Sequence, residues 1–317
     1  MSIQATTDPA CSGCESTPDI AALIDGKPRD IGGFDVRRLL PSVARRQVGP
    51  FVFFDHMGPA TLAAGQGLAV RPHPHVGLAT VTYLVDGEIL HRDSLGSQQA
   101  IRPGAVNWMT AGRGIVHSER SSDQERCNPS RLNGLQLWVA LPTAHEETDP
   151  AFHHHPSDTL PLVDRAGARL RVLAGEAFGA GSPVPVLSPL FYVEARLPAG
   201  GALELPDDYA ERALYVVEGS ISCGPELASP GRMLIFETGR AIRISTERGA
   251  RVMLFGGEPL DGERHIWWNL VSSSKTRIEK ARQDWQAGRF PTVPGDELEF
   301  TPAPSPAWPS AAREMRP

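Results

Sequence analysis

The segment Thr82-Tyr-Leu-Val-Asp-Gly-Glu-Ile89 decides the fold, because a similar segment, Leu214-Tyr-Val-Val-Glu-Gly-Ser-Ile221, follows it at an offset of 132 residues. Each is an apolar run that turns at Asp-Gly or Glu-Gly and continues as a second apolar run, the pattern of a β-hairpin. A Pro-Gly turn then opens a third strand in both copies, at Pro103-Gly104 and at Pro230-Gly231. Self-similarity over this distance indicates one β-unit that occurs twice.

The composition of the 317-residue chain favours short strands over long helices. Its 31 glycines and 29 prolines separate short runs rich in Val, Ile, Leu, Thr and aromatic residues, such as residues 135–141. This is the spacing of a β-sandwich or barrel. One segment differs, because Ile278, Ala281 and Trp285 recur at helical spacing. We therefore predict an all-β chain of two tandem barrels, with a helix at about 273–287.

A polar stretch rich in proline marks the join between the two copies, with Pro150, Pro156 and Pro161 around His153-His154-His155. The predicted parts of the chain are a flexible tail at 1–25, a first barrel at 26–145, a linker at 146–165, a second barrel with the helix at 166–295, and a C-terminal tail at 296–317. Within the linker, adventitious nickel binding is the activity expected of the three consecutive histidines.

Charge and cysteine content exclude several classes of protein. Lys and Arg number 31 against 37 Asp and Glu, a formal net charge of −6, so no basic surface for direct contact with nucleic acid is expected. No apolar run approaches the roughly 18 residues of a membrane span, and the first residues lack the features of a signal peptide. Four cysteines do not make a disulfide framework in a chain of this length. A reduced, cytoplasmic protein is expected, and the role of the Cys11 and Cys14 pair stays open.

Two pairs of polar residues in the first copy have the spacing of metal ligands. His73 and His75 alternate on a predicted strand, and so do His117 and Glu119, so each pair points to one face. An antiparallel barrel can bring the two pairs together inside its mouth. Imidazoles with one carboxylate suit a divalent transition metal and leave coordination positions open.

The second copy lacks these residues. Leu205 and Asp207 stand at the positions that match the first pair, and Ile244 and Thr246 stand near those that match the second. An isolated His-x-His is more often an accident of surface polarity than a metal site. Two such pairs in one repeat, and none in the other, favour a metal site in the first barrel alone.

A series of motifs carries a family resemblance, and the motifs occur in order along the chain: Thr80-Val-Thr-Tyr83, His91-Arg-Asp-Ser-Leu-Gly96, Gly104-Ala-Val-Asn-Trp-Met-Thr-Ala-Gly112, Gly114-Ile-Val-His-Ser-Glu119, Leu135-Gln-Leu-Trp138, Gly257-Glu-Pro-Leu260 and Ile266-Trp-Trp-Asn-Leu-Val-Ser-Ser-Ser274. Over about residues 30–290 the chain resembles the pirin family of the cupin superfamily. The resemblance implies a bicupin, with two double-stranded β-helix (jelly-roll) barrels and a metal in the first. The family's ligands fall on His73, His75, His117 and Glu119, and iron(II) is the metal implied. Ligand chemistry alone also permits Mn, Co, Ni, Cu or Zn.

The resemblance implies two kinds of function. Several pirins are quercetin 2,3-dioxygenases, which open a flavonol ring with O₂ and release carbon monoxide. In this chain Glu119 would then be both ligand and catalytic base, with a flavonol or related phenol and O₂ as substrates. Other pirins are redox-responsive regulators that bind a transcription factor or a metabolic enzyme, which leaves a protein partner open. A third interpretation is a cupin isomerase or a metal-free relic. Pirins are often monomers, which implies a monomer here.

Other polar residues are weaker candidates for the site. His56 could line the mouth of the first barrel or cap a turn, while Asn107 and Gln136 are amides within apolar strands. A buried amide needs hydrogen-bond partners, so either could contact a metal ligand or the substrate, or could bond only to the backbone. For His91, a structural hydrogen bond or salt-bridged turn is expected.

Overall fold

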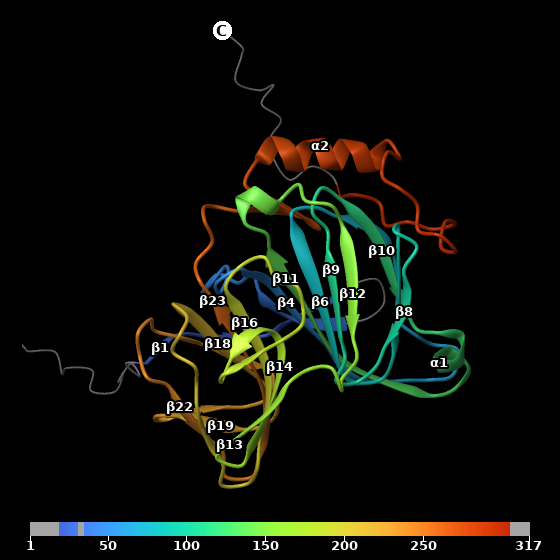
Figure 1. Cartoon of the computed structure of the whole chain (residues 1–317). Helices are drawn as coiled ribbons and strands as arrows, with labels where there is room; N and C mark the ends of the chain where they lie inside the picture. Colours follow the sequence, from blue (N-terminus) through green and yellow to red (C-terminus); the bar gives the residue numbers. More distant parts are fainter. Residues whose placement is uncertain (1–18, 31–34, 305–317) are drawn as a thin grey trace, which may run out of the picture.

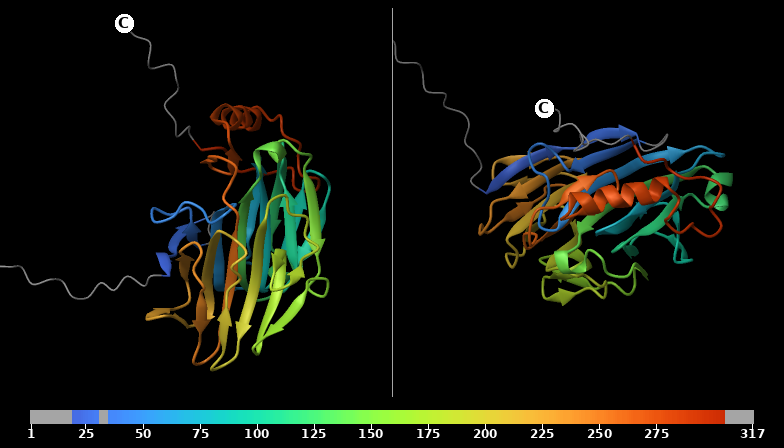
Figure 2. Two further views of the ribbon diagram at one scale, coloured as in Figure 1. Left: turned by 60° about the vertical axis from the view of Figure 1, so that its left-hand side comes forward. Right: turned by 90° about the horizontal axis from the view of Figure 1, so that it is seen from above.

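The computed structural model describes residues 19–30 and 35–304 of the chain. These residues form two β-barrels that lie side by side, with the helix α2 across the end of the first barrel (Figures 1 and 2). The predicted all-β architecture with a C-terminal helix is confirmed. No helix in the described ranges is long and apolar enough to cross a membrane.

The first barrel consists of a seven-stranded and a four-stranded sheet. In order across the larger sheet, the strands are β12 (Ala151–His155), β9 (Val106–Thr110), β6 (Leu78–Asp86), β11 (Ser130–Ala140), β4 (Phe51–Leu62), β3 (Asp35–Leu40) and β2 (Lys27–Asp30). In the smaller sheet they are β5 (Ala69–His75), β10 (Ile115–Arg120), β7 (Ile89–Asp93) and β8 (Gln98–Ile101). A short helix, α1 (Asp123–Cys127), and a 3₁₀ turn (Thr143–His145) lie in its connections.

The second barrel repeats this plan with an eight-stranded and a four-stranded sheet. Its larger sheet is made of β1 (Ile20–Asp25), β21 (Arg232–Phe236), β18 (Glu211–Gly219), β23 (Ala250–Gly257), β16 (Leu190–Leu197), β14 (Ala168–Ala177) and β13 (Leu162–Arg165), with β15 (Ala180–Gly181) paired to β14. The smaller sheet is made of β17 (Ala202–Glu204), β22 (Arg243–Ser245), β19 (Ile221–Cys223) and β20 (Glu226–Ala228). A separate pair, β24 (His265–Trp267) and β25 (Leu270–Ser272), precedes α2 (Lys275–Gln286).

The structure differs from the predicted boundaries in four places. Residues 162–165, expected at the end of the linker, form β13 and pair with β14 of the second barrel. Residues 20–25, expected in a flexible tail, form β1 and pair with β21 of the second barrel. Residues 151–155, expected in a linker, form β12 and pair with β9 of the first barrel. The start of the expected C-terminal tail also contacts the first barrel, because Thr301 N donates to Pro72 O. Residues 1–18, with Cys11 and Cys14, and residues 305–317 lie outside the described ranges.

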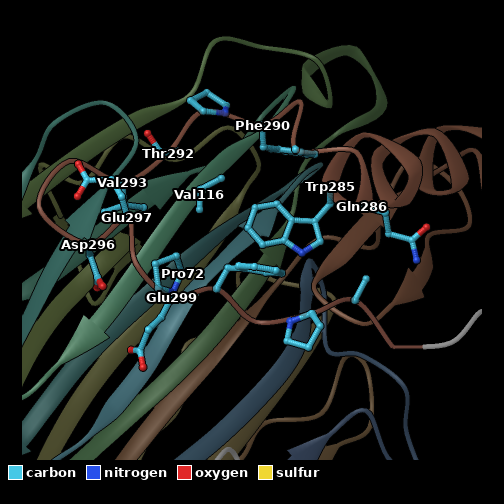
Figure 3. A pocket seen from close by; sticks show the side chains of 15 residues that line it. Pro72, Val116, Trp285, Gln286, Phe290, Thr292, Val293, Asp296, Glu297 and Glu299 are labelled. Carbon is cyan, nitrogen blue, oxygen red and sulfur yellow. The ribbon is translucent and has the colours of Figure 1, made fainter.

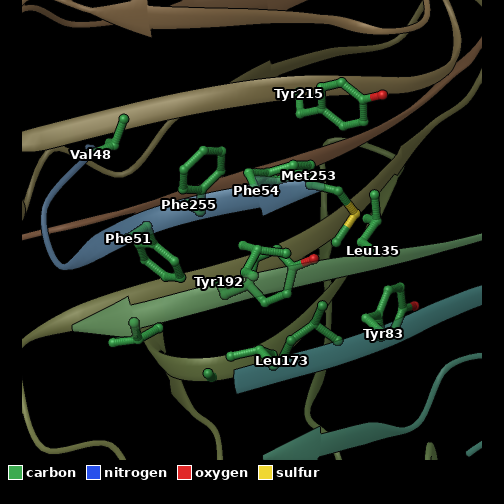
Figure 4. Close-up of a cluster of buried hydrophobic side chains, with 14 of the residues drawn as sticks. Val48, Phe51, Phe54, Tyr83, Leu135, Leu173, Tyr192, Tyr215, Met253 and Phe255 are labelled. Atoms are coloured by element: carbon green, nitrogen blue, oxygen red, sulfur yellow. The ribbon is translucent and has the colours of Figure 1, made fainter. Parts of the chain in front are cut away.

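The larger sheets of the two barrels pack face to face and share the main hydrophobic core. Phe51 of β4 meets Phe255 of β23 edge to face at 5.2 Å, and Phe54 meets Tyr215 of β18 at 4.9 Å (Figure 4). Aromatic pairs of this kind stabilise an interface beyond the area that they bury. The barrels are therefore held together by a core and not only by the connecting chain.

The interiors of the two barrels differ in polarity. Leu205 and Ile244, which replace two of the predicted ligands in the second copy, are buried in the hydrophobic core of the second barrel. The first barrel instead buries several histidines and carboxylates. Its end is covered by α2, whose Ile278 and Ala281 pack with Trp267. Trp267 is thus a packing residue.

Candidate metal centre

Two neighbouring strands of the first barrel carry the four ligand candidates, His73, His75, His117 and Glu119. β5 and β10 pair antiparallel, with His117 opposite His73 and Ile115 opposite His75. Because alternate residues of a strand share a face, both members of each predicted pair point into the barrel. All four are buried, with exposed fractions of 7%, 1%, 1% and 7% respectively.

The three imidazoles meet through their Nε2 atoms. His75 Nε2 lies 3.1 Å from His73 Nε2 and 3.1 Å from His117 Nε2. Two nitrogens that each lie at 2.0–2.1 Å from one metal ion are separated by about 3 Å at ordinary coordination angles. The spacing of the imidazoles therefore fits a shared ion.

Hydrogen bonds at the other ring nitrogens determine where the protons lie. His73 Nδ1 is 2.8 Å from the carbonyl oxygen of Arg71, and His75 Nδ1 is 3.0 Å from that of Asn269. A carbonyl oxygen only accepts, so each Nδ1 carries the proton of the neutral ring and each Nε2 presents a lone pair. Two lone pairs facing each other at 3.1 Å repel unless a cation lies between them, so the residues fit a metal.

Burial keeps these rings in the neutral form that binds metals. It lowers the pKa of His73 to about 4. It also lowers the pKa of His75 and His117 well below the ordinary value, and the neighbouring imidazoles add to the effect because a second positive charge nearby is unfavourable. At neutral pH all three rings are ready to act as ligands without first losing a proton.

The fourth candidate, Glu119, lies beside His117. Its carboxylate groups with His117 and His91, with ligand atoms within 4.8 Å of one another, while His73 and His75 form their own group with His117. Burial raises the pKa of Glu119, and a hydrogen bond from Thr82 Oγ1 at 3.1 Å partly opposes that rise. Glu119 is thus brought to the edge of the cluster, with His117 common to both groups.

His91 is a member of the site that sequence reasoning missed. It lies opposite Glu119 on the paired strands β7 and β10, and its Nδ1 is 3.4 Å from His117 Nδ1. Its Nε2 bonds to Asp93 Oδ2 at 3.0 Å, which is the structural hydrogen bond expected for it. The signal in the sequence was the His-x-Asp spacing, which places His91 and Asp93 on one face of a strand in the same way as the other two pairs.

The three weaker candidates occupy different places. His56 points away from the cluster into the core between the barrels, where its ring bonds to Tyr215 Oη and Asn133 Oδ1, both at 2.6 Å. Asn107 Oδ1 is 2.7 Å from His154 Nδ1. Gln136 shares the Thr82 hydroxyl with Glu119, with its Oε1 at 2.8 Å from Thr82 Oγ1. Of the three, only Gln136 is connected to a ligand candidate through a single side chain.

A cavity of about 370 Å³ lies on the outer side of the strands that carry the histidines (Figure 3). Pro72 and Val116 line it from positions next to His73 and His117, and Trp285 and Phe290 line it from α2 and the segment that follows. Because neighbouring residues of a strand face opposite sides, this cavity is separated from the ligand candidates by the sheet itself.

The segment after α2 forms the outer wall of this cavity and is fixed to β10. Arg120 donates two hydrogen bonds to Asp296, at 2.7 and 2.8 Å, and a third to Glu299 at 2.8 Å. Trp285 Nε1 donates to the carbonyl oxygen of Thr301. A planar guanidinium bound to a carboxylate at two points fixes orientation as well as position.

Two tandem barrels of this type, with a histidine cluster inside the first, define a bicupin. The pirin family model matches residues 33–139, and the model for the pirin C-terminal cupin domain matches residues 192–291. The chain is 49% identical over 288 residues to a pirin-like protein of Caulobacter vibrioides, which covers 90% of this chain and 99% of that protein. The chain therefore belongs to the pirin family, and the resemblance seen in the sequence is confirmed.

Relatives with more specific names are also similar to this chain. A Pseudomonas aeruginosa protein named "Putative quercetin 2,3-dioxygenase" is 41% identical over 280 residues, covering 86% of this chain and 87% of its own. The crystal structure of a quercetin 2,3-dioxygenase from Acinetobacter baumannii superimposes with a TM-score of 0.85 at 35% identity, covering 94% and 97% of the two chains. A bacterial pirin from Escherichia coli in complex with nickel(II) shares the fold, with a TM-score of 0.60 at 22% identity and coverage of 75% and 99%.

Proposed function

We propose that this chain is a metal-dependent dioxygenase that opens the ring of quercetin-type flavonols or related phenols with O₂. The observation that carries the proposal is the meeting of two unprotonated nitrogens, His73 Nε2 and His75 Nε2, 3.1 Å apart and beside His117. The names of the Pseudomonas and Acinetobacter relatives support the same class of reaction.

The ligand set suits one divalent transition metal, for which we propose iron(II). Neutral imidazoles with a carboxylate also accept Mn, Co, Ni, Cu or Zn, and the nickel(II) of the E. coli pirin falls in that range. When bound, such an ion would supply the Lewis acidity that favours the deprotonated form of a substrate hydroxyl. His73, His75 and His117 would hold it, with Glu119 as the fourth ligand.

Glu119 is also the proposed base. Its burial raises the pKa of the carboxyl group, which makes the carboxylate a better proton acceptor near neutral pH than an exposed glutamate. Thr82 donates to Oε1, and the carboxylate would take the proton of the flavonol 3-hydroxyl. The buried surroundings exclude water, so that the deprotonated ring reacts with O₂ rather than recovering a proton.

The described cysteines, Cys127 and Cys223, are free thiols. A cytoplasmic, monomeric enzyme is part of this proposal.

Turnover of quercetin by metal-loaded protein tests the proposal. We expect loss of the flavonol absorbance together with O₂ uptake and carbon monoxide release. Glu119→Gln is expected to lose at least about 100-fold in kcat, as for removal of a general base, while metal content stays measurable. Glu194→Gln is the matched control, because Glu194 is equally buried but pairs with Arg251 in the second barrel. No turnover with any of the six metals would refute the dioxygenase.

One observation favours a second candidate, a metal-containing regulator that binds a transcription factor or a metabolic enzyme. The ligand candidates are almost closed off from solvent, which suits a permanently held ion better than a site open to a flavonol. A regulator is expected to bind its partner with an affinity that changes when the metal is removed or oxidised, and to leave quercetin intact.

A further inference from the structure

Beyond the four ligand candidates, the first barrel contains a continuous row of buried polar groups that ends at His117. The order is His117, His91 and Asp93, with separations of 3.4 Å between the two Nδ1 atoms and 3.0 Å between His91 Nε2 and Asp93 Oδ2. His91 is 3% exposed and Asp93 is fully buried. If one of these groups is removed, its neighbour therefore loses a hydrogen bond that water does not restore, which lowers stability.

Strand pairing produces this row. In the ladder between β10 and β7, His117 stands opposite Asp93 and Glu119 stands opposite His91. All four side chains therefore point into the barrel from adjacent positions. The His91 ring is held in place by Phe152, with ring centroids 4.2 Å apart and an angle of 10° between the planes. Its two nitrogens consequently point in fixed directions.

The hydrogen bonds of Asp93 determine which nitrogen of His91 carries a proton. Asp93 Oδ1 accepts from the backbone N–H groups of Leu95 and Ser97, at 2.9 and 3.0 Å. Asp93 Oδ2 faces His91 Nε2, and a carboxylate only accepts. His91 therefore carries its proton on Nε2 and presents a lone pair at Nδ1.

That lone pair faces His117. A ring that binds a metal through Nε2 carries its proton on Nδ1, and an acceptor at that proton fixes the orientation of the ring and increases its basicity. For His117 the acceptor in reach is His91 Nδ1. We infer that Asp93 and His91 form a relay that positions His117 as a metal ligand. This inference rests on the proposed metal centre but not on the identity of the substrate.

Asp93→Asn is the sharpest perturbation of the relay. Because two backbone N–H groups meet Oδ1, the amide oxygen of asparagine must take that place, and its NH₂ group then faces His91 Nε2. His91 would have to move its proton to Nδ1, where it would oppose the Nδ1 proton of His117. The substitution replaces one oxygen by nitrogen, so it reverses the hydrogen bond between residues 91 and 93 without changing the volume of the side chain.

Zinc(II) is the probe, because it is diamagnetic and permits nitrogen-15 spectra of labelled histidine. In the wild type we expect the proton of His91 on Nε2 and that of His117 on Nδ1. In Asp93→Asn we expect the His91 proton on Nδ1 and a zinc affinity that is 10–100-fold lower in competition with a chromophoric chelator. Asp55→Asn is the matched control, since Asp55 is a buried carboxylate of the same barrel that pairs with Arg38 instead. It is expected to change neither result.

The outcomes separate this inference from the proposed function. A wild-type His91 with its proton on Nδ1 refutes the relay, even if the variant does not fold. Unchanged zinc affinity in a folded Asp93→Asn protein also refutes it. Zinc binding with the expected tautomers but without quercetin turnover by any metal form supports the relay and refutes the dioxygenase. Failure of the wild type to bind zinc refutes the metal centre and the relay together.

Discussion

Acidification of the metal-free protein is expected to reduce its stability through the buried histidines. His73 has a pKa of about 4 in the folded chain, against about 6.5 in an unfolded chain. As the pH falls below about 6.5, the His73 ring therefore binds a proton in the unfolded state while it stays neutral in the folded state. The contribution of His73 is fully present above about pH 6.5 and is lost as the pH falls toward 4.

The size of this loss follows from the two pKa values. Between about pH 8 and pH 5, His73 alone is expected to reduce the free energy of unfolding by about 2 kcal/mol. His75 and His117 act in the same direction, because burial lowers their pKa as well. Glu119 acts in the opposite direction, because its pKa is raised and its folded form accepts a proton more readily than its unfolded form.

Urea unfolding in the presence of a chelator, repeated across this pH range, measures the effect. The variant His73→Gln removes one titrating ring, so the difference between wild type and variant isolates His73 from Glu119. We expect that difference to change by about 2 kcal/mol between about pH 8 and pH 5. A difference that is independent of pH would show that His73 is accessible to protons in the folded protein, and would refute the reasoning.

Two further predictions concern the packing of the chain. Phe51→Ala removes a fully buried ring from the core between the barrels and is expected to cost about 3–5 kcal/mol, measured as a lower urea midpoint; a cost below about 1 kcal/mol would contradict a shared core. Arg120→Met removes the β10 partner of Asp296, which lies on the segment after α2. The variant is expected to lower the free energy of local unfolding of that segment by about 1–3 kcal/mol. Faster proteolysis after residue 295, with an unchanged rate elsewhere, is the result expected, and equal rates in wild type and variant would count against it.

Local patterns were sufficient for the parts of the site that depend on one strand. His73 with His75, and His117 with Glu119, share a face because of strand alternation alone. The distance between the two pairs depends on how β5 pairs with β10, for which the sequence has no local signal. His91 shows the same limit, because its bond to Asp93 is local while its approach to His117 depends on the register between β7 and β10.

Two misplaced features have different causes, burial of both faces in β4 and a polar composition in β12. In β4, Asp55 bonds to Arg38 and the next residue, His56, faces the second barrel. A strand covered on both sides does not alternate between apolar and polar residues, so a shift of one position cannot be detected. For β12, the polar composition of His153-His154-His155 suggested a linker, yet its backbone completes the edge of a sheet.

The first described strand, β1, belongs to the second barrel, while β2 and β3 belong to the first. Ile24 pairs with Met233 of β21. During synthesis β1 therefore stays unpaired until β21 leaves the ribosome, about 200 residues later. Pairings so distant in sequence slow folding. Until β21 arrives, an unpaired strand is available to another nascent chain, and exchange of β1 between two molecules is the error of assembly that this topology invites.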